Sequence, residues 1–197
     1  MGAFAELAAT SPEAFARLHE LAPPAAPVVL FTAAPLSLPA SWQLLLHKEL
    51  LQLVYPLPTA PPPPLAAPGP VALHEADVPA MLALTALTNP GPFLPRTIDF
   101  GGYYGFFHNG QLVAMAGQRL QPLPYVELSA VCTHPEHLGQ GYAHRLLLHQ
   151  LSGMLAAGHT PFLHVYEDNA PACALYYKLG FELRRRLHVY VLEKRAS

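Results

Sequence analysis

A glycine turn that leads directly into a long apolar helix is the feature that most constrains how this chain folds. It lies in HPEHLGQGYAHRLLLHQL, residues 134–151, where Gly139 and Gly141 flank a glutamine and a helix runs on to about Ala157 and ends at Gly158. Free N–H groups at the start of a helix attract anions, and glycine lets a phosphate come close to the backbone. The pattern therefore predicts an anion cradle, although a tight turn into a helix would use the same glycines.

The segment around this turn, residues 71–197, has the pattern of a complete α/β unit. A helix over EADVPAMLALTALT has Asp77 as its N-cap, a loop PGPFLPRT follows, and Asn109-Gly110 is the preferred turn pair of a β-hairpin. The segment YVELSAVCTH is predicted to be a strand that precedes the glycine turn and its helix. Three elements follow that helix: a strand PFLHVYE, a short helix NAPACALYYKLG closed by Gly180, and a final strand or strand pair FELRRRLHVYVLEK. Apolar residues mark the first helix and the first of these strands: Met81, Leu82, Leu84 and Leu87, then Val126, Leu128, Ala130 and Cys132.

Two further regions precede this unit. Residues 1–55 predict a small N-terminal α/β extension: a helix capped by Ser11 with Glu13 in its first turn, a buried strand PVVLF, and a second helix over SWQLLLHKELLQLVY. The second helix is inferred from the spacing of its apolar residues: Trp42, Leu45, Leu46, Leu50, Leu53 and Val54. Residues 56–70, PLPTAPPPPLAAPGP, predict an extended linker, because proline this dense blocks helix and inner strand; a docking segment for a partner protein is the alternative.

The composition excludes several classes of function. Of 197 residues, 52% are hydrophobic and 12% charged, so the chain can bury a sizeable core, and a homodimer is one way to hide remaining apolar surface. A net charge of −2 with neutral histidines offers no basic excess for nucleic acid or an anionic membrane. Two cysteines make no disulfide framework, and with neither a signal peptide nor a membrane span in the pattern the expected location is the cytoplasm.

Two motifs at the right separation resemble the GCN5-related N-acetyltransferases (GNAT), and within them the FR47-like branch; glycine N-acyltransferase-like proteins are also similar. The resemblance covers roughly residues 71–192 and rests on ELSAVCTHPEHLGQGYAHRLL and NAPACALYYKLGF. The family's loop begins Gln/Arg-x-x-Gly, and Leu138 departs from that pattern. The resemblance implies a GNAT domain at residues 71–197, with a twisted mixed β-sheet that is flanked by helices and splayed where coenzyme A enters.

The same resemblance implies a site for acetyl-CoA. The diphosphate would bind backbone N–H groups of the glycine turn, and the pantetheine arm would lie along the preceding strand, with the Val131 N–H facing the thioester carbonyl. Asn169 would hold the arm from the other side. The implied cofactor-binding residues are Val131, Cys132, Thr133, Leu138, Gly139, Gln140, Gly141, Tyr142, Ala143 and Asn169.

Direct acyl transfer to a primary amine is the implied reaction, and the amine would belong to a small molecule, an amino acid or a peptide N-terminus. Glu127 stands at the strand position where many family members keep a carboxylate base; a solvated surface glutamate is the alternative. Tyr176 stands in the place of the family's acid for the coenzyme A sulfur; a packing tyrosine is the alternative. Tyr177 points about 100° away from it on a helix.

The acceptor side is predicted from the loop and hairpin that precede the strand. Arg96, Tyr103 and Tyr104 lie where the family shapes its acceptor site. Arg96 would either grip an acceptor carboxylate through two hydrogen bonds or cap local carbonyl groups.

Other chemistries share the same residues. Cys132 beside His134 would suit a covalent acyl-cysteine, and adding His137 would suit a metal, but the resemblance implies direct transfer and no second ligand pair follows. No metal is therefore expected, and His134 as an auxiliary base stays open. Two other functions also stay open: a coenzyme A-binding sensor without turnover, and a docking protein that uses the proline-rich segment.

Overall fold

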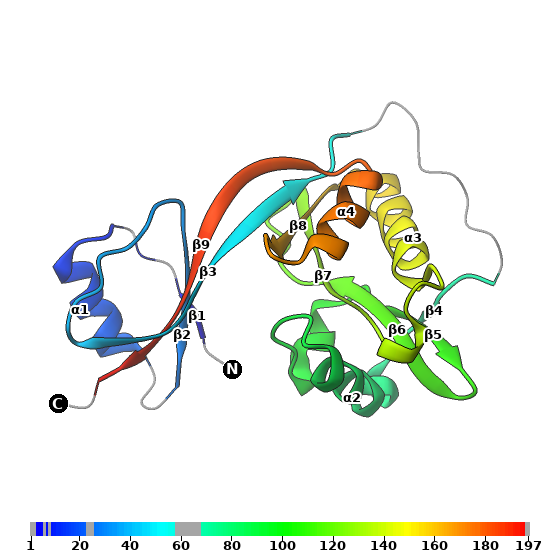
Figure 1. Cartoon of the computed structure of the whole chain (residues 1–197), viewed down its shortest axis with the longest axis horizontal. Coiled ribbons are helices and arrows are strands. Elements are labelled where there is room, and N and C mark those ends of the chain that lie inside the picture. Colours follow the sequence, from blue (N-terminus) through cyan, green and yellow to red (C-terminus); the bar gives the residue numbers. More distant parts are fainter. Residues whose placement is uncertain (1–2, 6, 8, 23–25, 58–67, 196–197) are drawn as a thin grey trace. The chain divides into compact units, whose positions relative to one another are not determined.

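The computed structural model confirms the expected mixture of α-helices and β-strands (Figure 1). It describes residues 3–5, 7, 9–22, 26–57 and 68–195. Most of the proline-rich linker predicted at residues 56–70, namely residues 58–67, lies outside the described part of the chain.

The chain divides into two compact units, each of which combines segments that are distant in sequence. The first comprises residues 1–52, 165–173 and 183–197, and the second residues 53–164 and 174–182. The boundaries expected from the sequence stay a prediction, and these units group the chain differently, because its C-terminal strand clusters with the N-terminal segment.

The first unit is a small mixed sheet with one helix. Its strands lie in the order β1-β2-β9-β3, with β1 parallel to β2 and β2 antiparallel to β9. The final segment of the chain is thus one long strand. The elements are β1 (Ala3–Ala5), α1 (Pro12–Leu21), β2 (Val28–Thr32), β3 (Trp42–Val54) and β9 (Glu182–Lys194).

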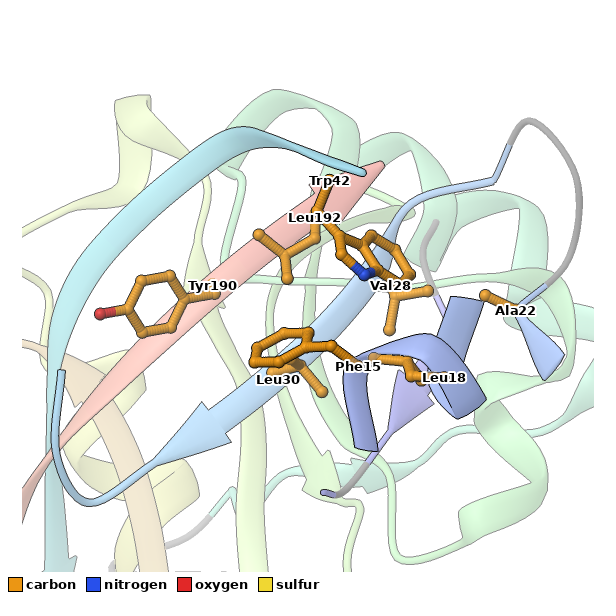
Figure 2. Packing of buried hydrophobic residues seen from close by; sticks show 8 residues of the cluster. All are labelled: Phe15, Leu18, Ala22, Val28, Leu30, Trp42, Tyr190 and Leu192. Carbon is orange, nitrogen blue, oxygen red and sulfur yellow. The ribbon is translucent and has the colours of Figure 1, made fainter. Parts of the chain in front are cut away.

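Helix α1 begins as predicted and packs on this sheet. The Ser11 hydroxyl accepts a hydrogen bond from the Ala14 N–H at 3.3 Å, which satisfies one of the free donors of the first turn. A ten-residue helix is marginal by itself, so the burial of its apolar face must hold it. Figure 2 shows that face against the sheet, with the cluster formed by Phe15, Leu18, Ala22, Val28, Leu30, Trp42, Tyr190 and Leu192.

The helix predicted over residues 41–55 is wrong, because residues 42–54 form the strand β3 beside β9. Leucine, glutamine and lysine favour helices only weakly, and pairing with neighbouring strands overrides such preferences. Leu50 and Leu53 are buried, whereas Leu44 and Leu45 are 47% and 45% exposed. The apolar residues therefore lie on a strand that is buried mainly toward its C-terminal end, and they do not form one stripe of a helix.

The second unit is a larger mixed sheet with the strand order β8-β7-β6-β5-β4. Strands β7 and β8 are parallel, and the other neighbouring pairs are antiparallel. The elements from β4 onward are β4 (Val71–Ala72), η1 (Glu75–Asp77), α2 (Val78–Thr88), η2 (Pro95–Phe100), β5 (Tyr104–His108), β6 (Gln111–Gln118), β7 (Tyr125–Thr133), η3 (Pro135–His137), α3 (Tyr142–Ala156), β8 (Thr160–Tyr166) and α4 (Ala170–Lys178).

Helices α2 and α3 cover opposite faces of this sheet (Figure 1). Side chains alternate along β6, so Met115 packs in one cluster with Leu84 of α2, whereas Ala114 and Ala116 pack in another with Leu146 of α3. The sheet is consequently buried on both faces at its centre.

Helix α2 differs in detail from its sequence prediction. Leu87 is 54% exposed, and Thr85 is buried in its place with Met81 and Leu84. Burial of a threonine is tolerated because its hydroxyl donates to the Met81 carbonyl at 2.9 Å. Asp77 precedes the helix as expected, but its carboxylate accepts from the His74 N–H at 2.8 Å instead of from the helix itself.

The turns predicted from glycine and asparagine are confirmed. Asn109 and Gly110 both have positive φ, 49° and 79°, as a two-residue hairpin turn of type I′ requires. Gly158 follows α3 with φ 74°, and Gly180 follows α4 with φ 97°. Within the described residues, none of the helices has both the length and the apolar character needed to cross a bilayer.

Candidate functional site

A bulge in β7 distorts the centre of the second unit. The pairing with β6 shifts between Met115, which stands opposite Cys132, and Gly117, which stands opposite Ser129. One extra residue therefore lies in β7, and Ala130 adopts a positive φ of 52°, which is uncommon for a residue other than glycine. A bulge of this kind bends the strand and increases its twist.

Beyond the bulge, one edge of β7 is open. In the described residues the parallel pairing of β7 with β8 ends at Leu128 and Leu163. The His134 N–H donates to a carbonyl of β6 at 2.7 Å, and successive N–H groups of a strand point to opposite edges. The N–H groups of Val131 and Thr133 therefore point away from β6, toward the edge that β8 has left.

The glycine turn follows this open edge after the short helix η3. Gly139 and Gly141 have φ of 75° and 78°, and a Cβ added at either would meet no atom within 4 Å. Glycine is therefore needed there for its backbone conformation and not for space. Gly141 occupies the N-cap of α3 without a capping side chain from the described residues, so the first N–H groups of α3 have no such acceptor. This conformation is compatible with an anion cradle, which stays a prediction.

Rings and a cation surround the start of α3. The Tyr142 ring lies 5.1 Å from the Phe106 ring and 6.4 Å from that of His137, and the Arg145 guanidinium lies 4.4 Å above Phe106. Leu138, by contrast, is 64% exposed, so its departure from the family pattern changes a surface side chain. The positive end of the helix dipole and the nearby guanidinium both favour an anion here.

Glu127 is fully buried and ionically paired, so it is not a solvated surface residue. Arg119 donates from Nε to Oε2 at 2.9 Å and from Nη2 to Oε1 at 2.7 Å, and His164 Nδ1 lies 2.8 Å from Oε1. Burial alone would raise the pKa of Glu127, but hydrogen bonds from His164 and Arg119 and the charge of Arg119 outweigh it and lower the pKa to about 2. A carboxylate held in this way accepts protons poorly at neutral pH.

Tyr103 lies on the same face of the sheet as this ion pair. Its ring covers Gly117, where an added Cβ would come within 2.2 Å of it. The side chain is 3% exposed, and its hydroxyl has no hydrogen-bond partner among the described residues. Burial raises the pKa of Tyr103 to about 12; of the nearby charges, Arg119 lowers it and Glu127 raises it. An unpaired buried hydroxyl costs stability, which makes it a ready contact for a ligand.

The other two predicted acceptor residues are not brought together with Tyr103. Tyr104 packs in the cluster on the α3 face, with its ring 4.3 Å from that of His149. The Arg96 side chain is 88% exposed and pairs with Asp99 at 2.5 Å, and its role toward an acceptor stays a prediction.

Tyr176 lies within α4, and Asn169 directly precedes this helix. Tyr176 is 7% exposed with its ring 5.9 Å from Phe181, whereas Tyr177 is 46% exposed. Asn169 precedes the helix, and its side-chain oxygen accepts from the Ala172 N–H at 3.3 Å. The roles of both residues in acyl transfer stay predictions.

Cys132 has the environment of an inert buried thiol. It is 7% exposed, and burial raises its pKa to about 11 despite a hydrogen bond with Thr88. The thiolate that a nucleophile requires is therefore scarce at neutral pH. Among the described residues, no three His, Cys, Asp or Glu side chains are grouped so that they could hold a metal ion.

Sequence reasoning missed Arg119 and His164. The available signal was a polar residue inside an otherwise apolar strand, Glu127 in YVELSAV and His164 in PFLHVY. Because Glu127 pairs with Phe162 across parallel strands, residue 164 projects from the same face as Glu127, but that pairing is not visible before the fold is known.

This chain is similar to one protein family and to several solved structures. The FR47-like protein family matches residues 103–191. A protein from Novosphingobium aromaticivorans, assigned to the GNAT family of acetyltransferases, is 40% identical with a TM-score of 0.87, over 99% of this chain and 85% of its own. A GNAT-family acetyltransferase from Colwellia psychrerythraea has 16% identity and a TM-score of 0.62 over 85% and 65% of the two chains.

The ribosomal-protein-S18-alanine N-acetyltransferase from Escherichia coli has 23% identity and a TM-score of 0.53, over 65% of this chain and 95% of its own. At such identities the last two structures share the fold alone. None of the curated protein sequences matches this chain significantly.

Proposed function

We propose that this chain, which belongs to the GNAT superfamily of acetyltransferases and to its FR47-like branch, transfers the acetyl group of acetyl-CoA to a primary amine. One observation carries the proposal: the open edge of β7 leads, through η3 and the glycine turn, to the start of α3, which has no capping side chain from the described residues. An open strand edge binds an extended chain that carries amide groups, and a helix start binds phosphate. Coenzyme A joins an amide-bearing arm to a diphosphate, so it matches both features in one molecule.

The residues present fit such a ligand. Thr133 has a buried hydroxyl without a hydrogen-bond partner in the described part of the chain, and this side chain lies on the strand that the pantetheine arm would follow. A buried polar atom of this kind is stabilised by a ligand amide that bonds to it. The backbone N–H groups from Gly139 to Ala143 would hold the diphosphate, and Arg145 would add positive charge.

Each candidate residue then has a definite task. Acetyl-CoA supplies a thioester whose carbonyl carbon is attacked by the amine. The outward N–H of Val131 would stabilise the negative charge that develops on the carbonyl oxygen, as an oxyanion donor. Tyr176 would give a proton to the departing sulfur. The buried hydroxyl of Tyr103 would contact the acceptor, which we take to be a small-molecule amine, an amino acid or a peptide N-terminus.

The proposal is tested by a matched pair of glycine substitutions at the two ends of α3. Gly141 and Gly158 have φ of 78° and 74°, and neither has an atom within 4 Å of an added Cβ. Alanine at either position forces the same left-handed backbone, which costs about 1 kcal/mol and lowers Tm by about 2–4 °C. Only Gly141→Ala alters the proposed diphosphate cradle.

Thermal melts with and without acetyl-CoA show whether Gly141→Ala loses acetyl-CoA binding that Gly158→Ala keeps. At 100 times its Kd, acetyl-CoA adds about 2.7 kcal/mol, or about 5–10 °C in Tm, to the wild type. We expect Gly158→Ala to keep this increase and Gly141→Ala to lose most of it. Transfer is then measured as coenzyme A release with a panel of amino acids, small primary amines and short peptides. Binding without release from any of them would favour a sensor, and equal responses of the two variants would contradict the cradle.

A further inference from the structure

His164 stands where β8 separates from β7. It directly follows Leu163, the last residue of β8 in register with β7. If the parallel register is continued, His164 is level with Ser129, immediately before the bulge that turns the Val131 N–H outward. The imidazole and the proposed oxyanion donor therefore border the same open edge.

The hydrogen bond with Glu127 sets the proton arrangement of the imidazole. Glu127 is ionised and can only accept, so the contact of 2.8 Å makes His164 Nδ1 the donor. In the neutral ring the proton then resides on Nδ1, and Nε2 carries the lone pair. Nε2 is directed away from the carboxylate by the shape of the ring. The His164 side chain is 9% exposed and the Glu127 side chain is fully buried.

Arg119 holds the same carboxylate as His164, with one hydrogen bond to each of its oxygens. Its two hydrogen bonds to Glu127 neutralise the carboxylate and fix its plane, and both side chains are largely buried, at 14% and 0% exposure. The same contacts leave Glu127 with a pKa of about 2 and hence little basicity.

We propose that His164 accepts the proton of the attacking amine, and that Arg119 and Glu127 act as positioning residues for it. The inference rests on the proposed function of this site. As the amine nitrogen forms its bond to the acetyl carbon, an N–H proton moves to His164 Nε2. The electron pair of the breaking C–S bond leaves with the sulfur, which is protonated in turn, and His164 returns its proton to solvent.

His164→Asn is the variant that isolates this role. The asparagine side-chain amide can keep an N–H donor for Glu127 but has no basic ring nitrogen. We expect it to keep the wild-type Tm and the stabilisation by acetyl-CoA, while kcat falls about 100-fold or more. His164→Ala should lose kcat similarly and regain part of it when imidazole is added. His159→Asn, a half-buried histidine before β8, is the control and should leave kcat unchanged.

The outcomes separate this inference from the function on which it depends. Unchanged kcat in His164→Asn, or a loss in His164→Ala that imidazole does not relieve, overturns the role of His164 while transfer by the wild type stands. A wild type that neither binds acetyl-CoA nor releases coenzyme A with the amine panel overturns both. Nitrogen NMR of histidine-labelled wild-type protein requires no acceptor: a proton on Nδ1 of neutral His164 supports the proposal, and a proton on Nε2 overturns it.

Discussion

The ion pair of Glu127 should make part of the stability of this protein depend on acid. Its pKa falls from an ordinary 4.5 to about 2 in the folded state, in spite of burial, because His164 and Arg119 donate to the carboxylate. A depressed pKa means that the folded state binds this proton less tightly than the unfolded state. The stabilisation is therefore present above about pH 4.5 and is lost as the pH falls toward about 2.

The size of this effect follows from the same values. A fall of the pKa from 4.5 to about 2 corresponds to about 3 kcal/mol at neutral pH, and about 2 kcal/mol of that would be lost by about pH 3. Glu127→Gln removes the titrating group and leaves Arg119 buried without its charge partner. We expect the free energy of unfolding of this variant to be about 3 kcal/mol lower than that of the wild type at neutral pH. Acid should then lower it less than it lowers that of the wild type, because the titrating carboxylate is gone.

Urea unfolding of both proteins at neutral pH and near pH 3 measures the difference. Glu20→Gln is the control, because Glu20 also pairs with an arginine, Arg17, but both side chains are more than 60% exposed. An exposed pair of this kind contributes little, so the control should follow the wild type at both pH values. If the stability of Glu127→Gln falls with acid in parallel with the wild type, the carboxylate is not held in its ionised form and the reasoning fails.

Four further predictions concern single residues. Tyr176→Phe should lower kcat about 100-fold and leave the Kd for acetyl-CoA unchanged; an unchanged rate would favour the packing role. Arg96→Ala should raise KM for carboxylate-bearing acceptors more than for plain amines, and equal effects would argue against a carboxylate grip. Gly117→Ala should destabilise by about 1–3 kcal/mol in urea, because its Cβ would meet the Tyr103 ring at 2.2 Å. Ser11→Ala should cost about 1 kcal/mol through loss of the cap of α1, and an unchanged midpoint would exclude that cap.

The fold was predictable where short segments decide their own conformation. The hairpin at Asn109-Gly110 and the helix start at Ser11 follow from residues within a few positions of each other. The glycine turn is of the same kind, because Gly139 and Gly141 supply positive φ without help from any neighbour. Local steric preferences of this sort act before tertiary packing and survive it.

The prediction failed where partners are distant in sequence. Residues 42–54 carry a pattern compatible with a helix, yet they form a strand because β9, more than 120 residues later, lies beside them. Leu87 was assigned to a buried stripe, but the packing of α2 on its sheet selects Thr85 instead. In both places intrinsic preference is weak, and the burial available in the tertiary structure decides.

The candidate site also combines features set by contiguous residues with features set by distant partners. The sequence by itself determined the glycine turn, the long helix after it and the strand before it, since each depends on contiguous residues. Only the tertiary structure decided that Glu127 is bound by Arg119 and His164, which lie 8 and 37 positions away, and that Tyr103 shares their face of the sheet while Tyr104 does not. Pairing register and the bulge at Ala130 set those relations, and register is a property of two strands together, so neither segment carries it alone.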